Sequence, residues 1–168
     1  TMVGVGEQAG CCTVALLTAM DRPLGRTAGN AIEVVESIAA LRGEERGELM
    51  EVTLALGAEM LLVAGKAATR ADALQTLQAA IDSGAALDRF REVIRWQGGD
   101  PAVVDAPALL PQAPVIRHLA VGRSGRMPPL PPRILGEAIV AMGGGRRTAA
   151  DPVDPAVGLE LLCPAGQA

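Results

Sequence analysis

The sequence predicts a helix-rich α/β fold with a parallel strand, followed by a small α+β module. Residues 13–18 are apolar on both faces of a strand, which is typical of the interior of a parallel sheet covered by helices. Apolar residues then recur at helical spacing in four segments up to Trp96. A proline-punctuated stretch at residues 106–114 separates these segments from a strand–helix–strand pattern.

The first predicted helix follows a turn at residues 21–25. Asn30 is its expected N-cap, with Glu33 three residues on as the partner in a capping-box-like arrangement. Gly43 is expected to end this helix, because glycine readily adopts the left-handed conformation found after helix C-termini.

Three more helices are predicted before Gly98. The second covers about residues 48–64 and carries an apolar stripe. Thr69 caps the third helix, with Asp72 at its third position, and Gly84 ends it. The fourth helix runs to Trp96. Residues 1–105 are therefore expected to form the end of an α/β domain.

The texture of the chain changes at the linker, residues 106–114. Beyond it, residues 115–168 are expected to form an α+β module that is incomplete. Its predicted elements are a strand, a turn, a helix and a second strand, at residues 115–121, 122–125, 133–142 and 157–162.

Composition and charge exclude some partners. The formal net charge is −4, whereas nucleic-acid backbones are held by a surplus of Lys and Arg. Phe90 and Trp96 are the only aromatic residues, which leaves few rings on which single-stranded bases could stack. No nucleic-acid partner is expected.

A cytoplasmic protein with no membrane partner is expected. Residues 50–67 are the most membrane-like stretch, but charged residues interrupt them, so a buried core helix is the better interpretation. Cys11, Cys12 and Cys163 form neither a disulfide framework nor a metal-binding pair, which suits a reducing compartment. They are expected to be buried small side chains.

Residues 17–34, LTAMDRPLGRTAGNAIEV, resemble the signature around the metal-binding loop of pyrimidine-nucleoside (thymidine) phosphorylases. Further matches follow in that family's order, at residues 56–60, 97–101, 110–111, 141–147 and 151–158. The resemblance implies a C-terminal fragment, truncated at both ends, that holds the second part of the phosphorylase α/β domain and most of its C-terminal module. It also implies a homodimer for the full-length enzyme.

The activity implied by the resemblance is that of a pentosyltransferase. Such an enzyme cleaves thymidine or another pyrimidine nucleoside reversibly, with inorganic phosphate as co-substrate, to the base and (deoxy)ribose 1-phosphate. The family's phosphate loop and base-holding residues are expected upstream, so no catalytic or substrate-binding residue is assigned here. The isolated chain is expected to be inactive.

The resemblance also implies a site for a monovalent cation, potassium. Its ligands here would be the carbonyls of Leu24 and Thr27 and the carboxylate of Glu36. Such oxygens are hard ligands that suit hard cations. From spacing alone, a solvated helix glutamate beside an ordinary turn is the favoured interpretation of Glu36, and the resemblance reverses this preference for a complete enzyme. The remaining ligands are expected outside these residues, so the site would be incomplete.

Other candidate motifs have structural interpretations. The glycines of residues 143–147 follow a predicted helix, whose negative dipole end repels phosphate, so a helix C-cap is favoured. His118 has no neighbouring Ser or Cys nucleophile, which indicates a strand-surface residue. Asp151 and Asp154 flank prolines and indicate loop chemistry rather than a catalytic pair.

Two alternatives to the phosphorylase hypothesis remain. The first is a non-catalytic, truncated homologue that acts as a structural or interaction module, because a strand without neighbours leaves a sheet edge that templates pairing. The second is a phosphoribosyltransferase with a related core, which fits less well because the region after Pro114 resembles the phosphorylases.

Overall fold

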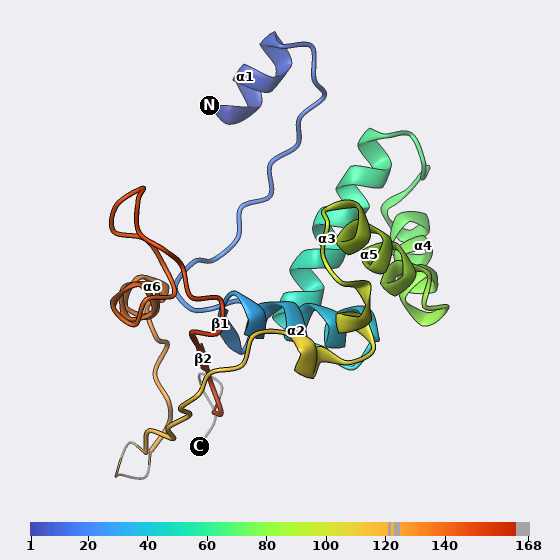
Figure 1. Ribbon diagram of the computed structural model, residues 1–168. Helices are drawn as coiled ribbons and strands as arrows, with labels where there is room; N and C mark the ends of the chain where they lie inside the picture. The colour runs from blue at the N-terminus through green and yellow to red at the C-terminus, as the bar shows by residue number, and fades with distance from the viewer. Residues whose placement is uncertain (121, 123–124, 164–168) are drawn as a thin grey trace.

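The computed structural model describes residues 1–120, 122 and 125–163, and helices dominate them (Figure 1). The elements in chain order are α1 (Met2–Gln8), β1 (Thr27–Gly29), α2 (Ala31–Leu41), α3 (Glu48–Val63), α4 (Arg70–Asp82), α5 (Ala85–Trp96), η1 (Pro101–Val104), η2 (Pro107–Leu109), α6 (Pro132–Ala141) and β2 (Gly158–Glu160). The helix-rich α/β class predicted from the sequence is confirmed.

The core lies among α2, α3, α4, α5 and η1: α3 packs on α4, α4 on α5, and α5 on α2 and η1 (Figure 1). Its most buried residues are small or β-branched: Ile38, Ala58, Ala73 and Val104 are each at most 1% exposed. Helices α3 and α4 approach closely, because a Cβ at Gly57 would lie only 2.9 Å from a methyl carbon of Leu77. Small residues at the crossing thus allow a tight helical cluster.

Of the two predicted N-caps, one is confirmed and the other forms no side-chain cap bond. Thr69 caps α4: its hydroxyl accepts from the Asp72 N–H at 3.1 Å and donates to the Asp72 carboxylate at 2.7 Å. Asn30 occupies the N-cap of α2 but makes no side-chain cap bond. Instead, Glu33 Oε1 accepts from the Gly29 N–H at 2.8 Å, which is one residue before the expected donor.

The small sheet joins distant parts of the chain. Strand β1 pairs with β2 antiparallel, with Gly29 opposite Gly158. Gly29 has φ +149°, and a Cβ there would lie 2.6 Å from the Val157 carbonyl oxygen. Only glycine allows this close approach without displacing backbone. The pairing places the C-terminal end of the described chain against the start of α2.

Two predicted strands are wrong. Residues 13–18 are extended but form no strand, and the described residues of 115–121, namely 115–120, are irregular and exposed. The described sheet is antiparallel, so the expected parallel strand is also absent from it. A β-strand needs a hydrogen-bonded neighbour, and neither segment meets one among the described residues.

The remaining C-terminal elements follow the expectation with small shifts. Helix α6 begins and ends one residue earlier than predicted, and Gly143, at φ +96°, follows its C-cap. The strand predicted at residues 157–162 is confirmed only at its centre, β2. The turn predicted at residues 122–125 includes positions outside the described residues.

Candidate functional site

The candidate site is a pocket beside the loop that precedes α2. Its walls come from residues 22–26, from Glu36 on α2, from residues 45–49 at the start of α3, and from a C-terminal group: Met127, Pro128, Leu130, Leu161 and Cys163. The pocket therefore lies where the loop before α2, the start of α3 and C-terminal residues meet. It contains Leu24 and Glu36, two of the three residues predicted to bind a cation.

The Glu36 carboxylate, on α2, accepts hydrogen bonds from the loop that precedes this helix. Its Oε1 accepts from the Arg26 N–H at 2.6 Å, and its Oε2 accepts from the Thr27 N–H at 3.3 Å and from the Thr27 hydroxyl. Hydrogen bonds to a charged carboxylate are stronger than those between neutral groups, so Glu36 fixes the conformation of this loop. The interpretation of Glu36 as a freely solvated helix side chain is therefore wrong.

The sheet orients Thr27 toward Glu36. The Leu161 N–H donates to the Arg26 carbonyl at 2.7 Å, while the Arg26 N–H donates to Glu36, so Arg26 and Leu161 share one of the two bonds of a hydrogen-bonded pair. Antiparallel ladders alternate, so the next pair, Thr27 and Glu160, directs its backbone groups away from the ladder. The Thr27 N–H lies on the side of β1 that carries the Glu36 carboxylate.

The chemistry of these donors suits a hard, singly charged cation. Glu36 supplies one negative charge, and its Oε1, which accepts a single bond, retains a lone pair, whereas Oε2 already accepts two. Leu24 and Thr27 would add neutral carbonyl oxygens. In the described part of the chain no three His, Cys, Asp or Glu side chains gather as they would for a multivalent metal.

An ion pair that sequence reasoning missed holds the outer edge of the pocket. Arg22 Nε donates to Glu48 Oε2 at 3.0 Å, and Arg22 Nη2 donates to Glu48 Oε1. This two-pronged bond, with the attraction between the charges, lowers the pKa of Glu48 and raises that of Arg22. Glu48 is the first residue of α3, so the bond attaches the turn to a helix start. Arg22 and Glu48 lie 26 residues apart in the sequence, a separation that neither helix nor strand periodicity would indicate.

The loop after α6 is built by Asp151. Its carboxylate accepts from the Arg147 N–H at 2.9 Å, from the Thr148 N–H at 3.0 Å and from the Thr148 hydroxyl at 2.6 Å. These bonds, the Thr148 hydroxyl foremost, hold the pKa of Asp151 below its usual value. Asp154 likewise accepts from the Ala156 N–H at 2.9 Å. The prediction of loop chemistry for both carboxylates is confirmed.

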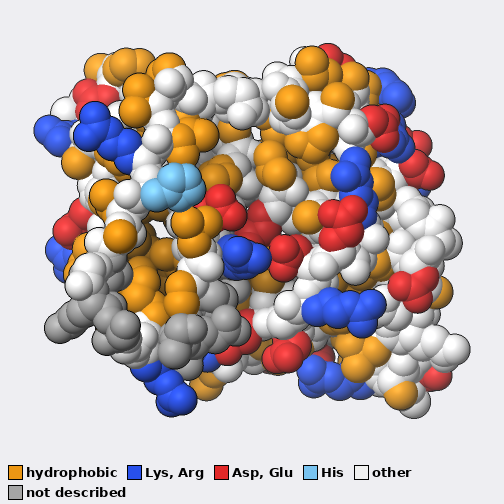
Figure 2. Space-filling model, turned by 90° about the horizontal axis from the view of Figure 1, so that it is seen from below, with side chains coloured by type: hydrophobic (Ala, Val, Ile, Leu, Met, Phe, Trp, Pro, Cys, Tyr) orange, Lys and Arg blue, Asp and Glu red, His pale blue; other side chains and the backbone are white. Residues whose placement is uncertain are grey.

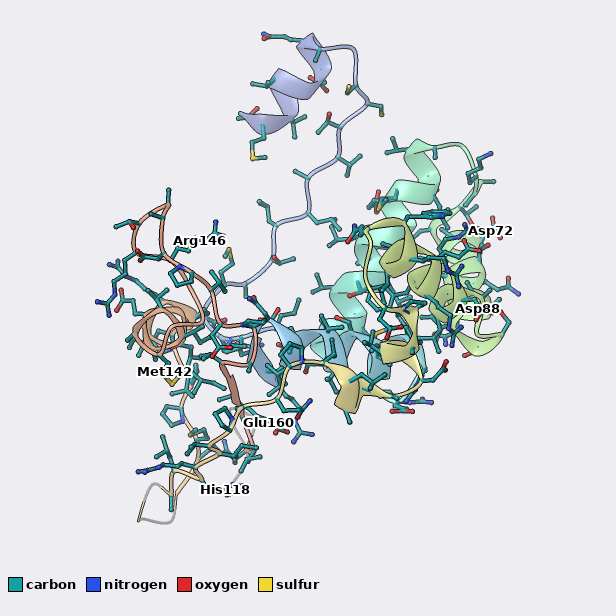
Figure 3. The ribbon with its side chains drawn as sticks, viewed as in Figure 1. Asp72, Asp88, His118, Met142, Arg146 and Glu160 are labelled. Atoms are coloured by element: carbon teal, nitrogen blue, oxygen red, sulfur yellow. The ribbon has the colours of Figure 1, made fainter. Side chains whose placement is uncertain are left out.

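The structure also places His118, Cys11 and Cys12, and it contradicts what was predicted for each. His118 lies in an irregular exposed segment, well away from Asp72 and Asp88 (Figure 3), so it is not on a strand surface as predicted. Cys11 and Cys12 are exposed, which contradicts their predicted burial, because the segment that carries them packs against no element. Acidic and basic side chains are interspersed on the face shown in Figure 2.

Comparisons with known proteins identify the family of this chain. The family model of the glycosyl transferase family, a/b domain, matches residues 1–87, and that of the pyrimidine nucleoside phosphorylase C-terminal domain matches residues 129–168. The pyrimidine-nucleoside phosphorylase of Staphylococcus aureus (strain bovine RF122 / ET3-1) is 42% identical over 160 residues, which are 95% of this chain. That of strain USA300 is 41% identical over 95% of this chain.

The chain belongs to the pyrimidine-nucleoside phosphorylase family. It spans 37% of the length of both Staphylococcus aureus phosphorylases. The pocket is lined by residues from both matched ranges, because Glu36 lies within the first and Leu130 and Leu161 within the second. Across the described residues, no helix of this phosphorylase family member is both long and apolar enough to span a bilayer.

Proposed function

We propose that this chain is the cation-binding and C-terminal part of a thymidine or pyrimidine-nucleoside phosphorylase. The whole enzyme would cleave pyrimidine nucleosides reversibly, with phosphate, to the base and (deoxy)ribose 1-phosphate, as a cytoplasmic homodimer. The observation that carries the proposal is the loop closed by Glu36, which lies inside the family-matched region and is tied to the C-terminal strand β2.

The reaction needs positioning and charge stabilisation rather than a covalent enzyme intermediate. A phosphate oxygen attacks the anomeric carbon, the bond from that carbon to the base nitrogen breaks, and its electron pair leaves with the base. Phosphate and base contacts would come from parts of the enzyme outside these 168 residues. The residues present here would hold the loop beside the phosphate site in a fixed shape.

Potassium is the proposed occupant of the loop, held by the carbonyls of Leu24 and Thr27 and by the Glu36 carboxylate. The donor chemistry and the orientation of Thr27 support this assignment. When bound, the cation supplies a positive charge that draws the loop and further oxygen ligands together. Those further ligands would lie outside this chain, so its own affinity for potassium should be weak.

Thermal unfolding in potassium chloride and in N-methylglucamine chloride of equal ionic strength tests the cation. Potassium should raise the Tm of the wild-type chain and leave that of Glu36→Gln unchanged. Glu44→Gln is the matched control, since Glu44 follows the same helix but does not line the pocket. An equal potassium effect in Glu36→Gln and in the wild type would overturn the assignment.

The activity itself is tested by base release. The purified 168-residue chain, given phosphate with thymidine or uridine, should release no more base than a boiled control. The protein from its native source should release base only when phosphate is present. Base release by the isolated chain would contradict the proposal that the phosphate and base contacts lie outside these residues. Absence of base release by the native protein would contradict the proposed activity.

A second candidate is a non-catalytic module that docks onto another chain. The exposed apolar segment before β1 favours it, because Leu17 and Met20 are 100% and 85% exposed. Such a module would assemble with a partner but release no base from thymidine or uridine in the assembled state. The phosphorylase proposal expects base release from the same assembly.

A further inference from the structure

The loop that precedes α2 is held at its two ends by different helices. At the end nearer α2, the Glu36 carboxylate accepts from the N–H groups of Arg26 and Thr27. At the other end, the Arg22 guanidinium donates to both oxygens of Glu48, the first residue of α3. Helices α2 and α3 therefore each fix one end of this loop.

The middle of the loop has no hydrogen bonds of its own in the described part of the chain. Positions 23–25 neither donate nor accept one there. Leu24, whose carbonyl is a proposed potassium ligand, is 45% exposed. The place of this carbonyl therefore depends on how the two ends of the loop are held.

The residue between Arg22 and Leu24 is stiff. It is Pro23, and a proline ring fixes its own φ at about −65° and restricts the preceding residue to extended conformations. Few soft dihedral angles thus separate the Arg22 side chain from the Leu24 carbonyl. A displacement of Arg22 is passed on to Leu24 rather than absorbed between them.

We propose that Arg22 and Glu48 are positioning residues for the cation. Their ion pair fixes the outer end of the loop on α3 and so places the Leu24 carbonyl for binding. This inference rests on the proposed function, in which Leu24 is a potassium ligand. Neither Arg22 nor Glu48 belongs to the proposed ligand set, so their effect acts through Leu24.

Position and charge predict different results for Arg22. Its guanidinium is positive and repels a nearby cation, so on charge alone its removal would strengthen potassium binding. Removal of the negative Glu48 would weaken binding on charge alone. A positioning role instead predicts that the loss of either partner weakens binding, because either loss releases the same end of the loop. The two single variants therefore separate position from charge.

Potassium titrations of the purified chain test this role. Potassium chloride replaces N-methylglucamine chloride at constant ionic strength, and the rise in Tm gives an apparent Kd. Arg22→Gln and Glu48→Gln should each raise this Kd about threefold to fivefold, which is the range of an exposed ion pair, since the two side chains are 37% and 50% exposed. The charge-swapped variant Arg22→Glu/Glu48→Arg should recover most of the loss, because the ion pair can form again.

Arg91→Gln is the matched control. Like Arg22, Arg91 lies between two carboxylates, those of Asp88 and Asp105, but it belongs to α5 and does not line the pocket. Its loss removes the same charge and a comparable set of ion pairs. The Tm of this variant should fall at every potassium concentration, while the apparent Kd stays that of the wild type.

The outcomes separate the positioning role from the cation itself. Tighter binding in Arg22→Gln, an unchanged Kd in both single variants, or an equal loss in Arg91→Gln would overturn the positioning role alone. The same titrations on the native protein decide the matter if the isolated chain responds too weakly for a Kd. If neither the wild-type chain nor the native protein responds to potassium, the proposed cation is wrong, and the positioning role falls with it.

Discussion

The Glu36 carboxylate lies directly against Gly25, where a Cβ would be 2.8 Å from the carboxylate carbon. The loop therefore has room for the carboxylate only because residue 25 lacks a side chain. The same carboxylate holds the N–H groups of Arg26 and Thr27, and the Arg26 carbonyl holds Leu161. Loop, helix α2 and strand β2 are thus connected through one side chain.

Gly25→Ala should destabilise the chain by about 1–3 kcal/mol, because the added methyl group displaces the Glu36 carboxylate. Urea unfolding followed by circular dichroism measures the change. Gly136→Ala is the control, since a Cβ at Gly136 in α6 meets nothing within 4 Å. That variant should be neutral or more stable by up to about 1 kcal/mol. Equal losses in both variants would show that the loop does not depend on the space at Gly25.

Glu36→Gln should loosen both the loop and the strand β2. The amide keeps one acceptor and turns an NH₂ group toward the N–H groups of Arg26 and Thr27. Deuterium exchange should therefore quicken at these two amides and at Leu161, which depends on the Arg26 carbonyl. The amide of Ala73 in α4 should not change. Faster exchange confined to Arg26 and Thr27 would contradict the connection to β2.

Gly29→Ala should weaken the pairing of β1 with β2 by more than backbone strain alone. Its φ of +149° and the Val157 oxygen 2.6 Å from the added Cβ both oppose a side chain. Gly47→Ala separates the two effects, because Gly47 has φ +125° and open space around it. Strain alone costs about 1–3 kcal/mol. Urea unfolding should show the larger loss for Gly29→Ala, and equal losses would rule out the contact with Val157.

Stability should fall in acid through Asp151. Its folded pKa lies below its unfolded pKa, about 3.9, so its contribution is fully present above the unfolded value. That contribution is lost as the pH falls through the folded value. Thr148→Val removes the hydroxyl bond that lowers the pKa most, so the folded pKa should lie closer to the unfolded one, and the acid-induced loss should be smaller and be complete at a higher pH than in the wild type. Unfolding midpoints measured from pH 2 to pH 6 check this. The same dependence of the midpoint on pH in the variant and in the wild type would contradict it.

The helices of the first part could be predicted from local signals. Thr69 caps α4 by accepting from the Asp72 N–H, as their spacing predicts, and α3 ends within one residue of its predicted end. These features depend on residues three or four positions apart, so neighbouring sequence suffices to specify them. At α2 the side chain of Asn30 makes no cap bond, and the first helical N–H, that of Ala31, donates to the distant Pro155 carbonyl at 3.0 Å, which local spacing could not predict.

The cation loop could be predicted only through the family resemblance. Leu24, Thr27 and Glu36 do lie around one loop, but nothing in their spacing shows that Glu36 folds back onto Arg26 and Thr27. The bond between Arg22 and Glu48 had no sequence signal at all. Cation binding by these residues stays a prediction.

The sequence by itself determined the helices, because they depend on local patterns, and the family, because its motifs occur in the expected order. Only the tertiary structure decided which extended segments became strands. Residues 27–29 pair because Gly29 and Gly158 let two backbones approach, whereas the more apolar residues 13–18 find no neighbour in the described fold. A strand exists through its partner, and the partner lies far away in sequence or in another region of protein.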